Sequence, residues 1–227
     1  MPTQRVHHQT AVGMRQPKRG RARQRSGTIG RILAAAEQAF AERGLAGSRT
    51  DQIAHAAHVN KALLYYYFSS KQQLYGAVLD SLFSQQQAAV GVANDSQAAH
   101  RETLLAYVNG YFDFVIVHPN YPRLVQREMM TRGPHLQRIV RDYWGPSQRR
   151  LVSAIESGIK AGEFRPVDPL HTVLSIIAMT VFYFAAAPVL GELWGRDTLR
   201  PRAIEARRQA VLDFLEHGLF VPPARKR

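Results

Sequence analysis

Cysteine is absent from this sequence of 227 residues. The absence excludes disulfide bonds, thiolate metal sites and a cysteine nucleophile, and it fits a cytoplasmic protein. Acidic residues are absent before Glu37, although lysine and arginine are frequent there. The N-terminal residues also lack the apolar stretch of a secretory signal, so we expect no such signal.

The patterns of an enzyme or a metalloprotein are missing as well. There is no glycine-rich phosphate loop, no spacing of serine, histidine and aspartate that suggests a triad, and no carboxylate pair of the acid–base kind. His55 and His58 are three residues apart on one expected helix, but no third metal ligand accompanies them. We therefore expect no enzymatic activity, no cofactor and no metal.

The charge is strongly unbalanced. Lysine and arginine total 30 against 17 acidic residues, which gives a net charge of +13. Such a charge indicates an anionic partner, either nucleic acid or an anionic membrane surface. Residues 1–27 carry the basic run Lys18–Arg25 without apolar periodicity, so we predict a flexible basic arm. Such an arm either contacts the phosphates or the minor groove of DNA, or is a disordered tail with nonspecific affinity.

Long uninterrupted apolar runs are scarce. The longest candidate, Val173–Leu190, is near the lower length limit of a transmembrane helix and contains Ser175, Thr180 and Pro188. We interpret it as a helix buried against other helices and expect no membrane partner.

The remaining pattern predicts an all-α protein. Apolar residues recur at steps of three and four, and neither a strand pattern nor an internal repeat is present. We expect a DNA-binding domain over residues 28–75 and a regulatory and dimerisation domain over residues 76–227. The helices are expected at 28–44, 50–57, 61–68, 70–90, 100–118, 121–131, 135–161, 169–187 and 201–217. The expected N-caps are Thr28, Thr50, Asn60, Ser69 or Ser70, and Asp168.

Residues Thr50–Phe68 carry the main functional signal. Two short helices are separated by the tight connection His58–Asn60, and the small residues Ala54 and Ala57 let the helices approach closely. This is the layout of a helix-turn-helix, in which the second helix enters the major groove of DNA.

The second helix of this unit carries side chains suited to DNA. Lys61 can neutralise a phosphate or reach a guanine edge, and Ala62 lets the backbone approach or contacts a thymine methyl group. The phenols of Tyr65–Tyr67 cannot share one helix face, so at least one is exposed and able to donate to a phosphate. The others are expected to pack against neighbouring helices. Lys71, at the start of the next helix, is a further phosphate candidate.

The segment Ile29–Leu74 resembles the DNA-binding domain of the TetR family of bacterial repressors. The resemblance implies an all-α homodimer that binds a double-stranded DNA operator, an unknown small-molecule effector, and release of DNA when the effector binds. The matching positions are Ala39-Phe40 before Gly44, Thr50 with Ile53-Ala54, the turn Ala57–Asn60, Leu64-Tyr65, Tyr67-Phe68, and Ser70-Lys71 with Leu74.

The resemblance also implies roles for single residues. The sequence departs from the family at His58, where glycine is usual, although histidine tolerates positive φ better than most residues. It departs again at Ala62, often glycine in the family, and at Leu63, more often polar. The implied phosphate contacts are Thr50, Asn60, Lys61, Tyr65, Tyr66 and Lys71, the implied base contacts are Ala62, Leu63 and Tyr67, and we add Arg49 to this DNA-binding set.

The C-terminal part resembles the regulatory domain of the same family in Tyr111–Met130, in Gly158–Pro169 and in the last two helices. The resemblance implies that these two helices pair with their mates across a two-fold axis, which accounts for the apolar segment Leu174–Phe184. An effector pocket is expected among the middle helices. Its bulky candidates, each of which is otherwise a core residue, are Tyr107, Tyr111, Phe114, His118, Met129, Met130, Trp144 and Phe182.

Two hypotheses therefore stand at this point. The first is a homodimeric repressor that a small molecule releases from its operator. The second is a nonspecific basic architectural or membrane-surface protein, which the basic arm and Val173–Leu190 would serve.

Overall fold

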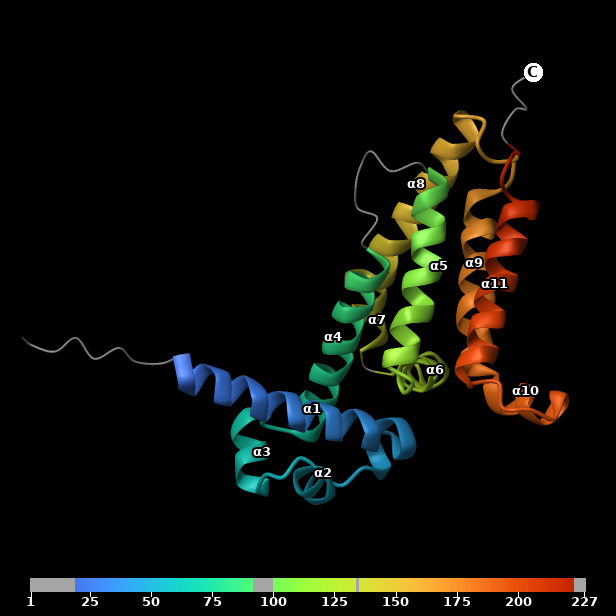
Figure 1. Ribbon diagram of the computed structural model, residues 1–227. Coiled ribbons are helices and arrows are strands. Elements are labelled where there is room, and N and C mark those ends of the chain that lie inside the picture. Colours follow the sequence, from blue (N-terminus) through green and yellow to red (C-terminus); the bar gives the residue numbers. More distant parts are fainter. Residues whose placement is uncertain (1–18, 92–99, 134, 223–227) are drawn as a thin grey trace, which may run out of the picture.

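The computed structural model describes residues 19–91, 100–133 and 135–222, and these residues form eleven α-helices and one π-helical turn. In this part of the chain the only β-pairing is an isolated antiparallel bridge between Phe164 and Phe220. The all-α prediction is confirmed. Figure 1 shows α1–α3 as a separate group below the upright helices of the regulatory part, with α4 rising from one into the other.

The N-terminal group consists of α1 (Arg19–Gly47), α2 (Thr50–Ala56), α3 (Lys61–Tyr67) and the first turns of α4 (Lys71–Val90). One apolar face of each helix points to a common centre, as the periodicity predicts. Its fully buried members include Ile32, Ala36, Phe40, Ile53, Leu64 and Leu74.

The start of α1 corrects two expectations. The helix begins at Arg19, so Thr28 lies inside it, buried, and is not its N-cap. Residues 19–27 are therefore helical, and the predicted arm 1–27 is wrong over this stretch; residues 1–18 lie outside the described part of the chain. The predicted stop at Gly44 is a break within α1, where φ is 70°, a value that favours glycine.

The caps of the following helices are mostly as expected. The Asn60 side chain accepts a hydrogen bond from the Leu63 amide, and Ser70 accepts one from the Gln73 amide. The prediction that Thr50 is an N-cap is wrong, because Thr50 is the first residue of α2. The N-cap is Arg49, whose side chain makes no capping hydrogen bond. His58 adopts φ 54° in the turn between α2 and α3, the left-handed conformation for which glycine is better suited.

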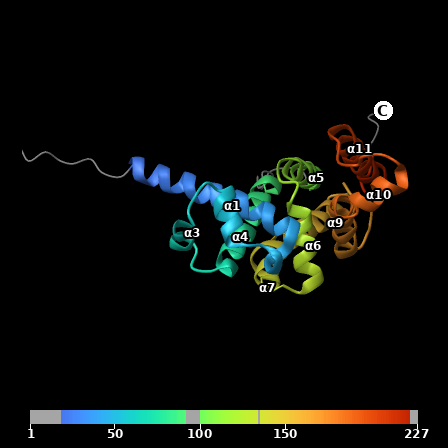
Figure 2. The same ribbon diagram turned by 90° about the horizontal axis from the view of Figure 1, so that it is seen from below.

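The regulatory part contains α5 (His100–Val117), α6 (Tyr121–Thr131), α7 (Leu136–Ile139), α8 (Gly145–Lys160), α9 (Pro169–Ala185), α10 (Ala187–Trp194) and α11 (Pro201–Gly218). The expected single helix over 135–161 is interrupted by the π-helical turn η1 (Val140–Trp144). Helix α10 was not expected: the chain breaks at Ala186 and turns away from α9. Figure 2 shows α3 and the α9–α11 helices at opposite sides of the molecule.

The apolar segment around α9 was the candidate for a membrane span. Among the described helices, none is by itself long and apolar enough to cross a bilayer. Helices α9 and α10 meet that test only when they are taken together, and the two are bent by 71°.

Candidate nucleic-acid interface and effector cavity

Helix α3 is held by one face and presents the other outward. Leu64 is fully buried, and Phe68, directly after the helix, is buried beside it. The exposed face carries Lys61, Ala62, Tyr65 and Tyr66, and the Tyr66 side chain is the most open of the three tyrosines at 74%. Because a recognition helix must keep its outer face free for the groove, this arrangement suits DNA binding.

The other two tyrosines of α3 have partners within the protein. The Tyr65 hydroxyl lies 3.2 Å from the Thr50 hydroxyl, which connects the middle of α3 to the first residue of α2. The Tyr67 ring packs half-buried against the core, and the Arg25 guanidinium lies 5.8 Å from its centroid. Tyr67, predicted to contact bases, is thus partly occupied in supporting α1.

The remaining predicted DNA contacts differ in their exposure and in whether they have a partner within the protein. Asn60 and Lys61 are exposed at the start of α3, and Leu63 is half-buried. Arg49 pairs with Asp51 at 2.7 Å on the surface. This hydrogen bond raises the pKa of Arg49 and lowers the pKa of Asp51.

Lys71 has a structural role that the sequence did not reveal. Its Nζ donates to the carbonyl oxygens of Ala46 at 3.2 Å and Ser48 at 3.0 Å, so it ties the start of α4 to the end of α1. An ammonium group has three donors, and one is left for a phosphate. Arg31, also missed, donates from Nε to the Ala57 carbonyl at 3.2 Å and holds the end of α2 against α1.

A cavity of about 280 Å³ lies among α4, α5, α6, α8 and α9. Four of the eight predicted effector residues line it: Tyr107, Tyr111, Met129 and Trp144. Trp144 ends the π-helical turn, a feature often found where a helix serves a functional site. Tyr121, Val125 and Met129 supply the α6 side of the cavity, and their i, i+4 spacing is a signal that sequence reasoning overlooked.

The other four predicted effector residues lie elsewhere. Phe114 and His118 stack on each other with ring centroids 4.5 Å apart, near the end of α5. Met130 points to solvent with 77% exposure. Phe182 is 66% exposed on the outer side of α9. None of the four lines the cavity described above.

The phenols of the cavity are neutral groups. Burial raises the pKa of Tyr107, Tyr111 and Tyr121 well above the ordinary value of a tyrosine. The hydroxyl of Tyr111 is buried and has no hydrogen-bond partner within the described structure. A buried hydroxyl without a partner is costly, so this atom is suited to a ligand that accepts a hydrogen bond.

Helix α6 also contacts the DNA-binding part, through Arg127 and Glu128, which lie between the cavity residues Val125 and Met129 in the chain. The Tyr75 hydroxyl on α4 donates to Glu128 Oε1 at 2.7 Å, and both side chains are buried. Arg127 reaches the Ala41 carbonyl of α1 at 3.5 Å. One short helix therefore lies between the cavity and the DNA-binding helices.

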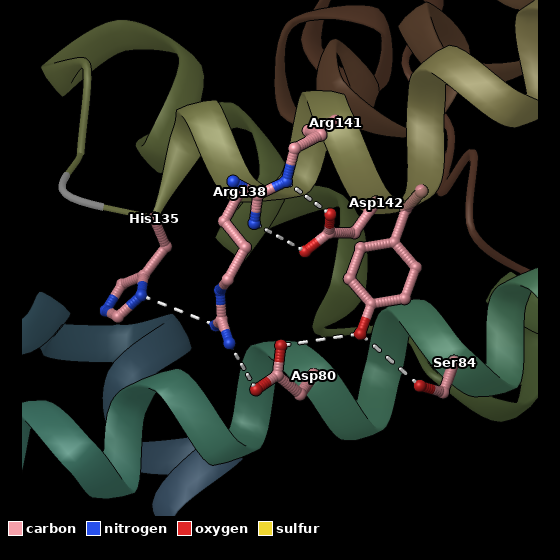
Figure 3. Close-up of polar contacts among 7 residues, drawn as sticks. Asp80, Ser84, His135, Arg138, Arg141 and Asp142 are labelled. Carbon is pink, nitrogen blue, oxygen red and sulfur yellow. Dashed lines mark hydrogen bonds and ion pairs between the residues drawn. The ribbon is translucent and has the colours of Figure 1, made fainter.

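A second polar contact joins α4 to the segment after α6. Figure 3 shows Arg138 between Asp80 and His135, with Nη1 at 2.7 Å from Asp80 Oδ2 and Nη2 at 3.5 Å from His135 Nδ1. On the neighbouring turn, Arg141 pairs with Asp142 at 2.6 Å and does not reach α4 in this view. The Asp80 carboxylate thus ties α4 to α7.

The last two long helices leave an apolar face uncovered. Leu174 and Phe182 on α9 and Phe214 on α11 are each more than 60% exposed. Large exposed apolar side chains gathered on one face mark an interaction surface.

The chain matches known proteins over both parts. The family described as bacterial regulatory proteins, tetR family, matches residues 32–78, and the family described as tetracyclin repressor-like, C-terminal domain, matches residues 101–215. The HTH-type transcriptional repressor NicS of Pseudomonas putida is 32% identical over 202 residues, which cover 86% of this chain and 90% of NicS. The HTH-type transcriptional regulator RutR of Escherichia coli is 32% identical over 173 residues, 74% of this chain and 79% of RutR.

A solved structure agrees with these relatives. The crystal structure of the putative transcriptional regulator SCO4942 from Streptomyces coelicolor superposes with a TM-score of 0.66 at 26% identity, and the match covers 85% of this chain and 98% of that one. The chain therefore belongs to the TetR family: it is a helix-turn-helix, DNA-binding transcriptional regulator and not an enzyme.

Proposed function

We propose that this regulator is a homodimeric repressor that a small molecule releases from a near-palindromic operator. The observation that carries the proposal is the position of α6. Val125 and Met129 on this helix line the cavity, while Arg127 and Glu128 contact α1 and α4 of the DNA-binding part. A ligand that moves α6 changes contacts with both of these helices.

The uncovered face of α9 and α11 supports the dimer. Leu174, Phe182 and Phe214 are large and apolar, and a two-fold axis through this face would bury them against their mates. Dimerisation sets the two α3 helices at a fixed separation. Successive major grooves on one side of DNA lie ~34–36 Å apart. A dimer that holds its two α3 helices at this separation can bind both half-sites of an operator.

The exposed side chains of α3 support a division of labour on DNA. Lys61 and Tyr66 are open and suited to phosphates, and Lys71 contributes its third donor. Ala62 and Leu63 offer apolar contact to thymine methyl groups rather than hydrogen bonds. Specificity then depends on Asn60 and Lys61 at the start of α3, on Tyr67, and on the spacing of the two copies.

Release follows from the same contacts. When a ligand fills the cavity, Val125 and Met129 are displaced, and Glu128 and Arg127 move with the helix that carries them. Because Tyr75 and the Ala41 carbonyl are the groups that they contact, α4 and α1 shift in turn. A coupling of about 1–3 kcal/mol between the two sites is typical of such a change.

The test begins with selection of DNA from a random library by the full chain. Fluorescence anisotropy then compares the selected duplex with a scrambled one at physiological salt. We expect the selected sequence to be two-fold symmetric and to bind at least 1,000-fold tighter than the scrambled duplex. Lys61→Ala should weaken binding, whereas Lys160→Ala, an exposed lysine at the end of α8, should not. Equal affinity for both duplexes would favour a nonspecific basic protein and overturn the proposal.

The dimer is tested separately by sedimentation equilibrium. Phe182→Asp should convert the dimer to a monomer, because it places a charge on the apolar face of α9. Met130→Asp is the matched control, since Met130 is at least as exposed but lies on α6, away from that face. A dimer that survives Phe182→Asp would show that another surface holds the copies together.

A further inference from the structure

The chemistry of the cavity is unusual for so basic a protein. The chain carries a net charge of +13, yet no lysine, arginine, histidine, aspartate or glutamate is among the described residues that line the cavity. The polar groups that face it come from phenols, glutamine amides, Ser147 and the Trp144 indole. A ligand inside would therefore meet dipoles and apolar surface, and no opposite charge.

One cation close to the lining already has a partner. Arg150 on α8 donates from Nη2 to the side-chain oxygen of Gln87, a residue that lines the cavity, at 3.0 Å. An ion that enters the cavity loses part of its hydration and gains no paired charge, which is unfavourable. The lining thus discriminates against ions of either sign.

One polar atom in the cavity lacks a partner. The Tyr111 hydroxyl is buried and makes no hydrogen bond within the described structure, although its ring has the rings of Tyr107 and Tyr121 as neighbours. Burial raises the pKa of this phenol, so it keeps its proton at neutral pH. The hydroxyl can therefore donate a hydrogen bond to an acceptor on a ligand.

The volume limits the size of the ligand. A water molecule occupies about 30 Å³ in the liquid, so a cavity of about 280 Å³ corresponds to roughly nine or ten waters. A molecule with one or two rings fills this space, and the aromatic rings that line it offer stacking surface.

We propose that the effector is a small, uncharged, ring-containing molecule whose carbonyl or similar acceptor takes a hydrogen bond from the Tyr111 hydroxyl. The inference rests on the proposed function, because it names the chemistry of the molecule that acts through this cavity. It assigns Tyr111 as the residue that orients the effector, and the uncharged lining as the reason why ions are rejected.

The test uses four probes of nearly equal size: acetophenone, its carbon isostere α-methylstyrene, benzoate and benzamidinium. The chain has two tryptophans, so Trp194→Phe leaves Trp144 as the only indole, and its N–H resonance reports binding at the cavity in DNA-free protein. We expect acetophenone to bind at least tenfold tighter than either ion. Tyr111→Phe should lower the affinity for acetophenone about fivefold, which corresponds to the loss of one hydrogen bond, and leave the affinity for α-methylstyrene unchanged.

Tyr143→Phe is the matched control, because that phenol is half-buried outside the cavity and bonds Asp80 on α4. Benzoate or benzamidinium binding as tightly as acetophenone would overturn the inference. So would an unchanged acetophenone affinity in Tyr111→Phe, or the absence of any shift with all four probes at 10 mM. DNA does not enter this measurement: failure to bind an operator overturns the proposed function, while failure to bind acetophenone overturns the present inference alone.

Discussion

Tyr75→Phe removes one hydroxyl from the contact between α4 and α6 and leaves the ring in place. The Phe40 ring packs edge-on against it at 5.0 Å, and the His135 ring lies 5.6 Å away, so the apolar packing survives the change. Only the donor to Glu128 is lost. The variant therefore isolates the hydrogen bond that joins the DNA-binding part to the cavity helix.

The cost follows from burial. Tyr75 and Glu128 are 1% and 3% exposed, and Glu128 Oε2 has no hydrogen-bond partner within the described structure. A hydrogen bond to a charged group contributes about 1.5–3 kcal/mol, and removing one partner leaves the other buried without compensation. We expect Tyr75→Phe to lower the free energy of unfolding by about 2–3 kcal/mol.

Urea unfolding followed by circular dichroism measures this loss, at one fixed protein concentration because a dimer's stability depends on it. Tyr143→Phe is the control: its hydroxyl is half-buried and 3.4 Å from Asp80, so about 0.5 kcal/mol or less is expected. The double variant Tyr75→Phe/Glu128→Met removes both polar partners and should recover most of the loss. Equal effects of Tyr75→Phe and Tyr143→Phe would refute the reasoning.

Three further predictions concern the turn, the tether and the buried phenols. His58→Val should lower the free energy of unfolding by about 1–2 kcal/mol in urea titrations, whereas His58→Gly should not, because the residue adopts φ 54°. Lys71→Ala should weaken binding to every DNA sequence and reduce the slope of log K against log salt by about 0.9 per half-site. An unchanged slope would mean that Lys71 only bonds the carbonyl groups of Ala46 and Ser48 and contacts no phosphate. Burial raises the pKa of four phenols, those of Tyr75, Tyr107, Tyr111 and Tyr121. The stability that they contribute is therefore complete below pH 10 and is lost as the pH rises above it. Ultraviolet titration should show these tyrosines as a late class that ionises only on unfolding.

Local signals were reliable where the interaction spans a few residues. Asn60, Ser70 and Asp168 cap their helices as predicted, because each side chain bonds an amide three residues later in the chain. Thr50 is not a cap, because α2 begins at this residue and Arg49 precedes it as the N-cap. The Thr50 hydroxyl lies instead beside that of Tyr65, fifteen residues away, a contact that no local pattern reveals. The early start of α1 was missed because its glycines suggested a loop, although the arginines, alanine and glutamine among them favour helix.

The cavity was only half predictable. Tyr107 and Tyr111 lie four residues apart on α5 and face the same space, as helical periodicity implies. Phe182 and Met130 are equally bulky and apolar, but they point outward. Periodicity tells which residues share a face, and it does not tell whether that face meets a cavity, a second subunit or solvent. The π-helical turn that brings Trp144 into the lining has no sequence signature of its own.

The sequence by itself determined the all-α class, the helix-turn-helix and its family, since these depend on periodicity, caps and turn residues that act within one or two helical turns. The tertiary structure alone decided that Lys71 binds backbone carbonyls, that α6 lies between the cavity and the DNA-binding helices, and that the cavity carries no charge. These features arise where distant segments meet, and the partner of a side chain there is set by the packing of whole helices rather than by its neighbours in the chain.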